Sequence, residues 1–175
     1  MKKIIQGLGT TKNYLDKKIK WDKLTEILDS IRYAPSSGDL QNWKVVVVDD
    51  LENKKKLAKF SYDQTWVSKA SVVLVVCNDQ SEVKRMFKGK ADFYSTQNCA
   101  AGIQNMLLRA TSLGIDSAWI RTFNAERIRS LLSIPEDIKI DALITLGYAK
   151  KREEKVRVNE LKNVVYFREW GNSEL

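Results

Sequence analysis

The chain has 175 residues, a length that suits one domain with a well-formed core and is short for two. Histidine is absent, which excludes Ser-His-Asp and Cys-His catalysis, most zinc sites and the most frequent general acid–base residue. The formal net charge of +8 favours anionic small molecules or nucleic acid as partners. Because acidic residues interrupt the basic runs, we interpret those runs first as solvated faces, which makes nucleic acid the less favoured partner.

No apolar run approaches the roughly 20 residues that a membrane helix needs. The first residues also lack the apolar core of a signal peptide. We therefore expect a cytoplasmic protein that does not bind membranes. Cys77 and Cys99 lie in apolar or alanine-rich surroundings, so we interpret both as small buried residues, neither a disulfide nor a nucleophile. An enzyme with so few reactive side chains would depend on a bound cofactor.

Hydrophobic periodicity predicts an alternation of helices and strands along the chain. Helices are expected at 22–33, 51–60, 92–113 and 125–132, and strands at 43–49, 71–77, 116–120 and 140–148. The segment 80–92 is expected to be part helix and part loop, and Asn124 is the predicted N-cap of the helix that follows it. Strands that alternate with helices indicate an α/β or α+β sandwich with helices on both faces of the sheet.

Two further stretches bear on assembly. Ala100, Ala101 and Gly102 give the longest helix a centre almost without side chains, so it is either a core helix alone or one that also packs against its counterpart in a dimer. The last 25 or so residues are charged but end in "NVVYFREW", whose apolar side chains need cover. A neighbouring subunit is one source of that cover.

The loop "APSSGDLQNW" at 34–43 joins the first predicted helix to the first predicted strand. Pro35 ends the helix, and Gly38 permits a turn that other residues resist. Ser36, Ser37 and Asp39 add several hydrogen-bond donors and acceptors within a few residues. On physical grounds alone, an ordinary turn whose serines satisfy its own backbone is the first interpretation.

In order, however, the loop resembles the SPSSxNxQPW signature of the nitroreductase-like FMN-binding family. The resemblance continues through four further segments in the family's order: "DQTWVSKASVVLVV", "NCAAGIQNMLLRATSLGIDSAWIRTF", "LLSIPEDIKIDALITLGYA" and "KVRVNELKNVVYFREW". It implies a single domain over residues 1–175, a three-layer sandwich with a mixed central sheet. It also implies a homodimer with FMN at the interface and a C-terminal arm, about 155–175, that embraces the partner subunit.

The family's activity implies hydride transfer from NADH or NADPH through flavin N5 to a small acceptor such as a nitroaromatic, quinone or enone. Lys12 would stabilise negative charge on the reduced flavin. The partner's loop would contact the flavin, and Lys155 and Arg157 would hold its phosphate. The cofactor-binding residues that the resemblance implies are Thr10, Lys12, Pro35, Ser36, Ser37, Asp39, Gln64, Arg121, Lys155 and Arg157.

Three departures from the family pattern leave alternatives open. Asp39 replaces the usual asparagine, two basic residues are missing before Thr10, and Arg121 and Thr122 replace one or two glycines that follow the Trp-Ile pair in many relatives. These changes would weaken FMN binding or narrow the pocket. They leave open a flavin-binding member with specialised or lost reductase activity, and the positive net charge leaves open a basic nucleic-acid-binding protein.

Overall fold

The structure, a computed structural model, describes residues 1–151 and 158–173. Its helices are α1 (Lys2–Gly7), α2 (Trp21–Asp29), α3 (Leu51–Phe60), α4 (Ser81–Phe87), α5 (Ala91–Ser112) and α6 (Ala125–Leu132). Its strands are β1 (Trp43–Val48), β2 (Val72–Asp79), β3 (Asp116–Ile120) and β4 (Ile138–Gly147). Every predicted helix and strand is present, and a 3₁₀ turn over Ser30–Tyr33 continues α2 to the predicted end. Asn124 caps α6, because its side chain accepts a hydrogen bond from the amide of Arg127.

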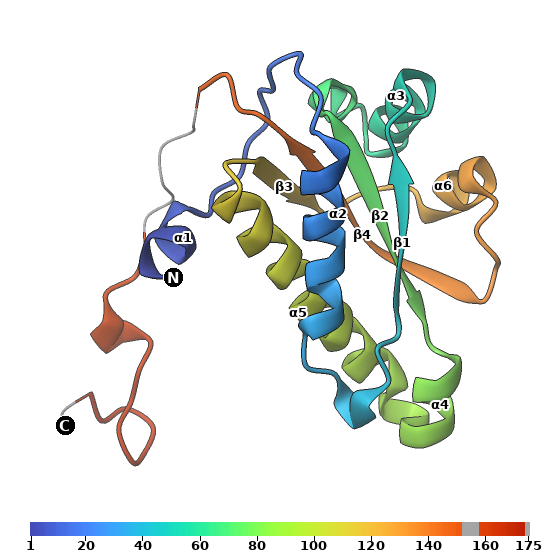
Figure 1. The fold of residues 1–175 in the computed structure, drawn as a ribbon. Helices are drawn as coiled ribbons and strands as arrows, with labels where there is room; N and C mark the ends of the chain where they lie inside the picture. The colour runs from blue at the N-terminus through green and yellow to red at the C-terminus, as the bar shows by residue number, and fades with distance from the viewer. Residues whose placement is uncertain (152–157, 174–175) are drawn as a thin grey trace.

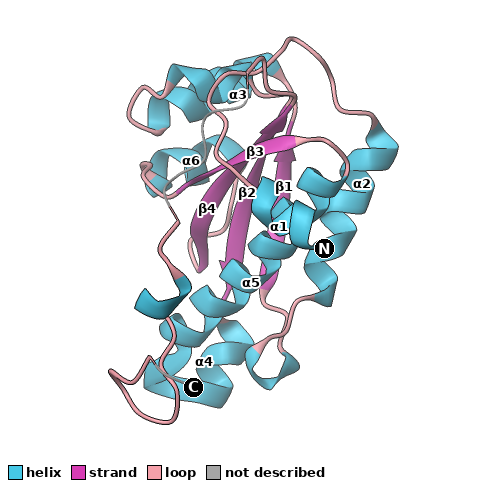
Figure 2. Ribbon diagram, turned by 90° about the vertical axis from the view of Figure 1, so that its left-hand side faces the viewer, coloured by secondary structure: helices cyan, strands magenta, loops and turns pink. Residues whose placement is uncertain are grey.

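The four strands form one sheet in the order β1-β2-β4-β3, with helices on both faces (Figures 1 and 2). Alternate residues of β2 divide between two cores: Val72, Leu74 and Val76 pack with α2 and α5. Val73, Val75 and Cys77 pack with α3 and α6. This division explains why the strand reads as a continuous apolar run, and it confirms the predicted three-layer sandwich.

The expectation of a mixed sheet is wrong for the described strands, because every pairing between them is antiparallel. β1 pairs with β2, β2 with β4 and β3 with β4, all antiparallel. Val48, the last residue of β1, pairs with Val73 near the start of β2, so β2 begins at the same end of the sheet at which β1 finishes. The parallel component among the described residues is an isolated bridge between Thr10 and Ser117.

Gly102 allows close packing between elements of the same chain. A Cβ built on it would lie 2.6 Å from Cγ1 of Ile31 and 3.5 Å from the ring of Trp43. The glycine therefore lets the end of the first helical segment approach α5 closely, which is the core-helix interpretation of the small residues. Ala100 and Ala101 are half-buried, so the dimer interpretation stays a prediction.

Gly102→Ala is expected to lower the free energy of unfolding by about 1–3 kcal/mol, because Ile31 is buried and cannot move aside without cost. In an uncrowded helix the same change would raise stability by about 0.5–1 kcal/mol. Urea denaturation would measure the sign. Gly89→Ala is the matched control, since no atom lies within 4 Å of the position that its added methyl group would occupy. A Gly102→Ala protein as stable as the natural one would contradict the close approach.

Candidate functional site

The predicted residues Thr10 and Lys12 lie in a segment that runs along the outer edge of β3. The amide of Thr11 donates a hydrogen bond of 2.9 Å to the carbonyl oxygen of Ser117, and Thr10 forms a parallel bridge with the same residue. Lys12 is exposed, and its ammonium lies 5.9 Å from the ring centroid of Trp66. These contacts place the segment 10–12 between β3 and the turn that precedes β2.

Gln64 and Arg121 lie in two loops that contact each other. The amide of Asn124 donates a 2.7 Å hydrogen bond to the carbonyl oxygen of Phe60, which joins the loop after β3 to the end of α3. Gln64 is half-buried and donates to the carbonyl oxygen of Ser61 over 2.9 Å. Arg121 is exposed and forms no hydrogen bond or ion pair with another described residue. The segments that carry Thr10, Lys12, Gln64 and Arg121 therefore meet in one region.

Two buried polar atoms in this region lack a protein partner. Among the described residues, neither Oγ of Ser61 nor Nε1 of Trp119 has a hydrogen-bond partner. Ser61 precedes Gln64 by three positions and Trp119 precedes Arg121 by two. Buried polar groups are nearly always paired, so unpaired ones in the same segments as the predicted residues fit a polar ligand.

The loop 34–43 satisfies part of its own backbone. The amide of Asp39 donates to the carbonyl oxygen of Ser36, and the amide of Gln41 donates to Oγ of Ser36. The Asp39 carboxylate accepts a 3.2 Å hydrogen bond from Gln41 Nε2, and both residues have a positive φ. Pro35 and Asp39 are exposed, and Ser36 and Ser37 are half-buried. The loop thus forms part of its hydrogen bonds internally, as an ordinary turn does. Pro35, Asp39 and the hydroxyl group of Ser37 remain available for other contacts.

A buried amide network, defined by Asn42, Asn78 and Asn98, holds this loop from behind. Nδ2 of Asn42 donates to Oδ1 of Asn78 over 2.8 Å, and Oδ1 of Asn42 accepts from Nδ2 of Asn98 over 2.7 Å. Oδ1 of Asn98 accepts from the amide of Ser37 over 2.9 Å, so the network reaches the predicted loop directly. All three asparagines are buried. None of the three is among the predicted site residues, although Asn78 ends an apolar run and Asn42 belongs to the loop itself.

Charged residues extend this network to the surface. Asn78 donates to Oδ2 of Asp141, whose other oxygen lies 3.4 Å from the ammonium of Lys139. Hydrogen bonds from Lys139 and Gln80 lower the pKa of Asp92 below its usual range. The group is a structural network, since it places no free nucleophile or base at the surface.

The cysteines are unsuited to catalysis, as the sequence predicts. Both are buried and unpaired with each other. Burial raises the pKa of the Cys77 thiol to about 11, and the pKa of Cys99 is raised further for the same reason. A thiol reacts as a thiolate, so neither side chain is an activated nucleophile at neutral pH.

Thr10 and the loop 34–43 lie toward opposite ends of the sheet (Figure 1), and Arg121, which follows Ile120 beside the middle of the sheet, lies between them. Ser117, next to Thr10, pairs with Leu146, which pairs with Val72 at the start of β2. The loop 34–43 ends at Trp43, which pairs with Asn78 near the end of the same strand. Six residues of extended chain between Val72 and Asn78 span about 20 Å. Thr10 and Lys12 are thus well separated from the loop within one chain, and Lys155 and Arg157 lie outside the described residues.

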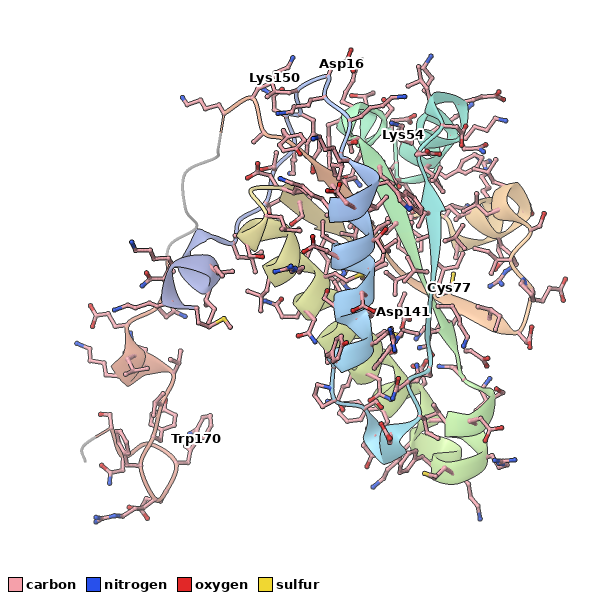
Figure 3. All side chains as sticks on the ribbon, in the orientation of Figure 1. Asp16, Lys54, Cys77, Asp141, Lys150 and Trp170 are labelled. Atoms are coloured by element: carbon pink, nitrogen blue, oxygen red, sulfur yellow. The ribbon has the colours of Figure 1, made fainter. Side chains whose placement is uncertain are left out.

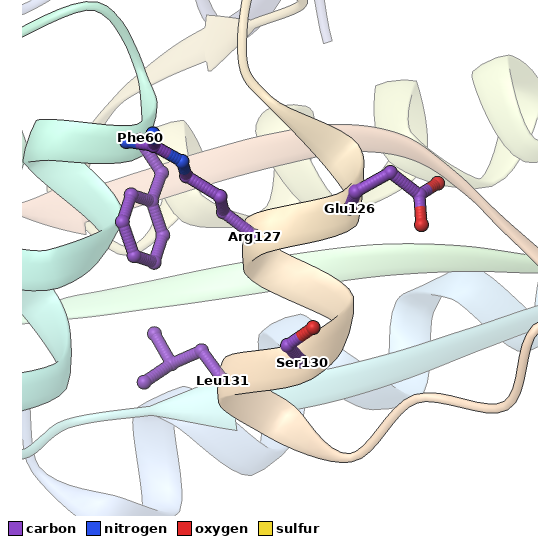
Figure 4. A pocket seen from close by; sticks show the side chains of 5 residues that line it. All are labelled: Phe60, Glu126, Arg127, Ser130 and Leu131. Carbon is purple, nitrogen blue, oxygen red and sulfur yellow. The ribbon is translucent and has the colours of Figure 1, made fainter.

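One surface pocket lies next to the contact between Phe60 and Asn124 that joins the segments of Gln64 and Arg121. It occupies about 530 Å³ between α3 and α6 and is lined by Phe60, Glu126, Arg127, Ser130 and Leu131 (Figure 4). The guanidinium of Arg127 lies over the ring of Phe60, with 5.7 Å between its carbon and the ring centroid. None of the predicted site residues that the structure describes lines this pocket.

Comparison with known proteins gives consistent results. The model of the Nitroreductase family matches residues 9–80 and 61–148. The chain is 34% identical over 157 residues to a putative NADH dehydrogenase/NAD(P)H nitroreductase from Archaeoglobus fulgidus, covering 87% of each chain. It is 29% identical over 118 residues to an FMN reductase [NAD(P)H] from Bacillus subtilis, covering 66% of this chain and 47% of the relative. The crystallised NADPH:FMN oxidoreductase from Vibrio harveyi, complexed with NAD+, has the same fold, with a TM-score of 0.86 at 23% identity over 96% of this chain and 76% of that one.

Proposed function

Because the chain belongs to the nitroreductase family, an oxidoreductase family, we propose that it is an FMN-dependent NAD(P)H oxidoreductase. The FMN reductase among its relatives supports the choice of cofactor. The unpaired buried atoms of Ser61 and Trp119 and the gathering of Lys12, Gln64 and Arg121 fit a ligand with many polar atoms. When bound, FMN supplies the centre that accepts a hydride from NADH or NADPH and passes electrons to a nitroaromatic, quinone or enone.

The observation that carries this proposal is the separation of Thr10 and Lys12 from the loop 34–43. About 20 Å of strand lies between the ends of the sheet that carry them. A second copy of the chain, placed with its loop 35–39 beside the first chain's Thr10 and Lys12, would complete each site from both subunits. A homodimer with two such sites follows from the two-fold symmetry of that arrangement.

The residues have distinct roles in the proposed site. Lys12, exposed and held near Trp66, would place its ammonium where negative charge develops on the reduced flavin. Gln64 would present an amide to the ring, and Arg121, free of protein partners among the described residues, would attract anionic groups of the donor or acceptor. Ser36, Ser37, Pro35 and Asp39 would contact the flavin of the partner subunit. Lys155 and Arg157 would supply positive charge for the phosphate.

The C-terminal segment fits the same assembly. Residues 158–173 stand away from the body, and Trp170 lies far from the sheet (Figure 3). Leu161 is 71% exposed and Trp170 is 89% exposed, and Tyr166 contacts Trp170 at 4.8 Å between ring centroids. A monomer would leave this apolar surface in water, so we propose that the arm packs on the partner subunit.

Absorbance spectroscopy tests the proposal directly. Purified protein is expected to carry, or to take up, one FMN per chain, and NADH or NADPH should bleach the flavin bands. Colourless protein that refuses added FMN would identify a member that has lost the cofactor. Retention on DNA that falls as salt rises, without flavin, would instead favour the nucleic-acid-binding alternative.

Lys12→Met is expected to weaken FMN binding about tenfold, because a charge-assisted contact contributes about 1.5–3 kcal/mol. It should also slow reduction of the flavin, since positive charge near the developing negative charge is lost. Flavin fluorescence titration and stopped-flow reduction measure the two effects. Lys55→Met, an exposed lysine on α3 outside the site, is the control. Unchanged affinity and unchanged reduction in Lys12→Met would remove Lys12 from the site.

A further inference from the structure

A large cavity lies beside the candidate flavin site. It has a volume of about 820 Å³ and lies between residues 12–24, the start of α3 and the segment 68–72 that leads into β2. Lys54, Asp16 and Lys150, which line it, are labelled at one end of the molecule in Figure 3. The volume is within the range of about 300–1,000 Å³ that is usual for small-molecule sites. Of the predicted flavin residues within 1–151, Lys12 alone lines it.

Positive charge predominates on the walls of this cavity. Among the described residues, six lysines and three aspartates line it: Lys12, Lys17, Lys18, Lys54, Lys69 and Lys150, with Asp16, Asp49 and Asp50. The Asp50 carboxylate is already engaged, because it accepts hydrogen bonds from the amide and the side chain of Asn53 at 2.8 and 3.1 Å. Asp50 keeps its negative charge, but the described lysines outnumber the aspartates, and this excess of positive charge attracts a multiply charged anion.

Lys54 provides a donor that is built into the wall. The residue is 8% exposed, and its ammonium donates to the carbonyl oxygens of Ala70 and Ser71 at 2.8 and 3.1 Å. An ammonium has three protons, and the third has no acceptor among the described residues. Burial lowers the pKa of Lys54, since the charged form is poorly solvated. An anion in the cavity would supply the missing acceptor and would add to the negative charge of Asp16, Asp49 and Asp50, which already acts on Lys54.

Aromatic groups accompany the lysines. The indole of Trp21 lines the cavity and is 71% exposed, so one part of the wall offers a free aromatic surface. The Lys17 ammonium lies 4.4 Å from the ring centroid of Tyr148, which holds that charge near the cavity. Lysines suit phosphate groups, and an exposed indole suits the flat ring of a base.

We propose that this cavity binds a nucleoside diphosphate, with the phosphates against Lys17, Lys18 and Lys54 and the base on Trp21. The same chemistry occurs in a free nucleotide and in the ADP half of NADH or NADPH. Binding of ADP itself requires no flavin, so this inference stands independently of the proposed oxidoreductase function. Only its connection to the electron donor rests on that function.

Isothermal titration of the full chain with ADP at fixed ionic strength tests the proposal. We expect saturable binding with one ADP per chain. The double variant Lys17→Gln/Lys18→Gln should bind ADP about tenfold more weakly, because two exposed cations are removed. Lys54→Met should weaken binding similarly, and Trp21→Leu should reduce both the affinity and the fluorescence change. Because Lys17 and Lys18 are exposed, the double variant keeps the test valid if Lys54→Met unfolds.

The control is Lys55→Gln/Lys59→Gln, which removes the same charge from exposed positions of α3 outside the cavity. Equal weakening in the control, or no saturable binding by the natural chain, would overturn the proposal. FMN affinity should not change in Lys17→Gln/Lys18→Gln, which separates this site from the flavin site.

Steady-state kinetics identifies the source of the nucleotide. If the cavity holds the ADP half of the electron donor, Lys17→Gln/Lys18→Gln should raise KM for NADH or NADPH by the same factor as the Kd for ADP, with kcat unchanged. If it holds a free nucleotide, KM should be unchanged while ADP binding is still weakened. Protein that binds ADP but not FMN would support the cavity and contradict the proposed function.

Discussion

Asn42→Leu is expected to lower the free energy of unfolding by about 3 kcal/mol or more, the largest stability loss that we expect from a single substitution. Leucine has nearly the same size but neither donates nor accepts a hydrogen bond. It would leave Oδ1 of Asn78 and Nδ2 of Asn98 without their partner in a buried position, while the carbonyl oxygen of Ser95 keeps its hydrogen bond within α5. Each unpaired buried group costs about 1–3 kcal/mol, and the added apolar contact offsets only part of that cost.

Urea denaturation measures the loss, and Asn105→Ala is the matched control. Asn105 lies on α5, as Asn98 does, but it is half-buried and donates one hydrogen bond of 3.3 Å to the carbonyl oxygen of Ser30. Its removal should cost about 1 kcal/mol or less. An Asn42→Leu protein that unfolds at the same urea concentration as the natural chain would show that the network does not stabilise the fold.

The same network connects stability to the site. In Asn98→Ala the amide of Ser37 loses its acceptor, so its hydrogen exchange should accelerate even where global stability is largely kept. Asn98→Asp keeps an oxygen for Ser37 but loses the donor to Asn42, so it should protect that amide better than alanine does. If Ser37 helps to bind FMN across the dimer, the order of FMN affinity should follow the order of amide protection.

The sequence predicts those parts of the fold that depend on local pattern. The continuous apolar run of β2 predicts a strand that is covered on both faces. Asn124 is predicted as the N-cap of α6 from its position directly before the helix. The burial of Cys77 follows from the apolar run around it. Each of these features is decided within about ten residues of chain, which is the range over which periodicity and capping act.

The parts that could not be predicted depend on contacts between distant residues. Asn42 and Asn98 are 56 positions apart, and Lys54 is 16 positions from Ala70. In the sequence Lys54 is one of three consecutive lysines, and nothing local distinguishes it from its exposed neighbours. Its burial results from the way α3 packs on the segment before β2. The hydrogen bonds of the loop 34–43 also depend on folding. Some form within the loop, and one runs from the amide of Ser37 to Asn98 on α5.

Complementation between two defective chains is expected to restore FMN binding, because each proposed site combines Lys12 of one chain with Ser37 of the other. Lys12→Met impairs the first group. Ser37→Trp would obstruct the second group while keeping the backbone amide, which donates a hydrogen bond to Asn98. In a mixed dimer one site receives both defects and the other receives none. Random pairing of equal amounts should therefore restore about a quarter of the natural number of sites.

The control pairs two defects of the same group, Lys12→Met with Gln64→Leu. In that mixed dimer each site contains one defect, so mixing should restore nothing. FMN stoichiometry, measured after co-expression at an FMN concentration that saturates only the natural site, distinguishes the outcomes. Equal results for the two mixtures would mean that one chain builds the whole site, and the 20 Å or so of strand between the two groups would then need bridging within a single chain. Restoration in the first mixture alone would assign the loop 35–39 to the flavin of the partner subunit.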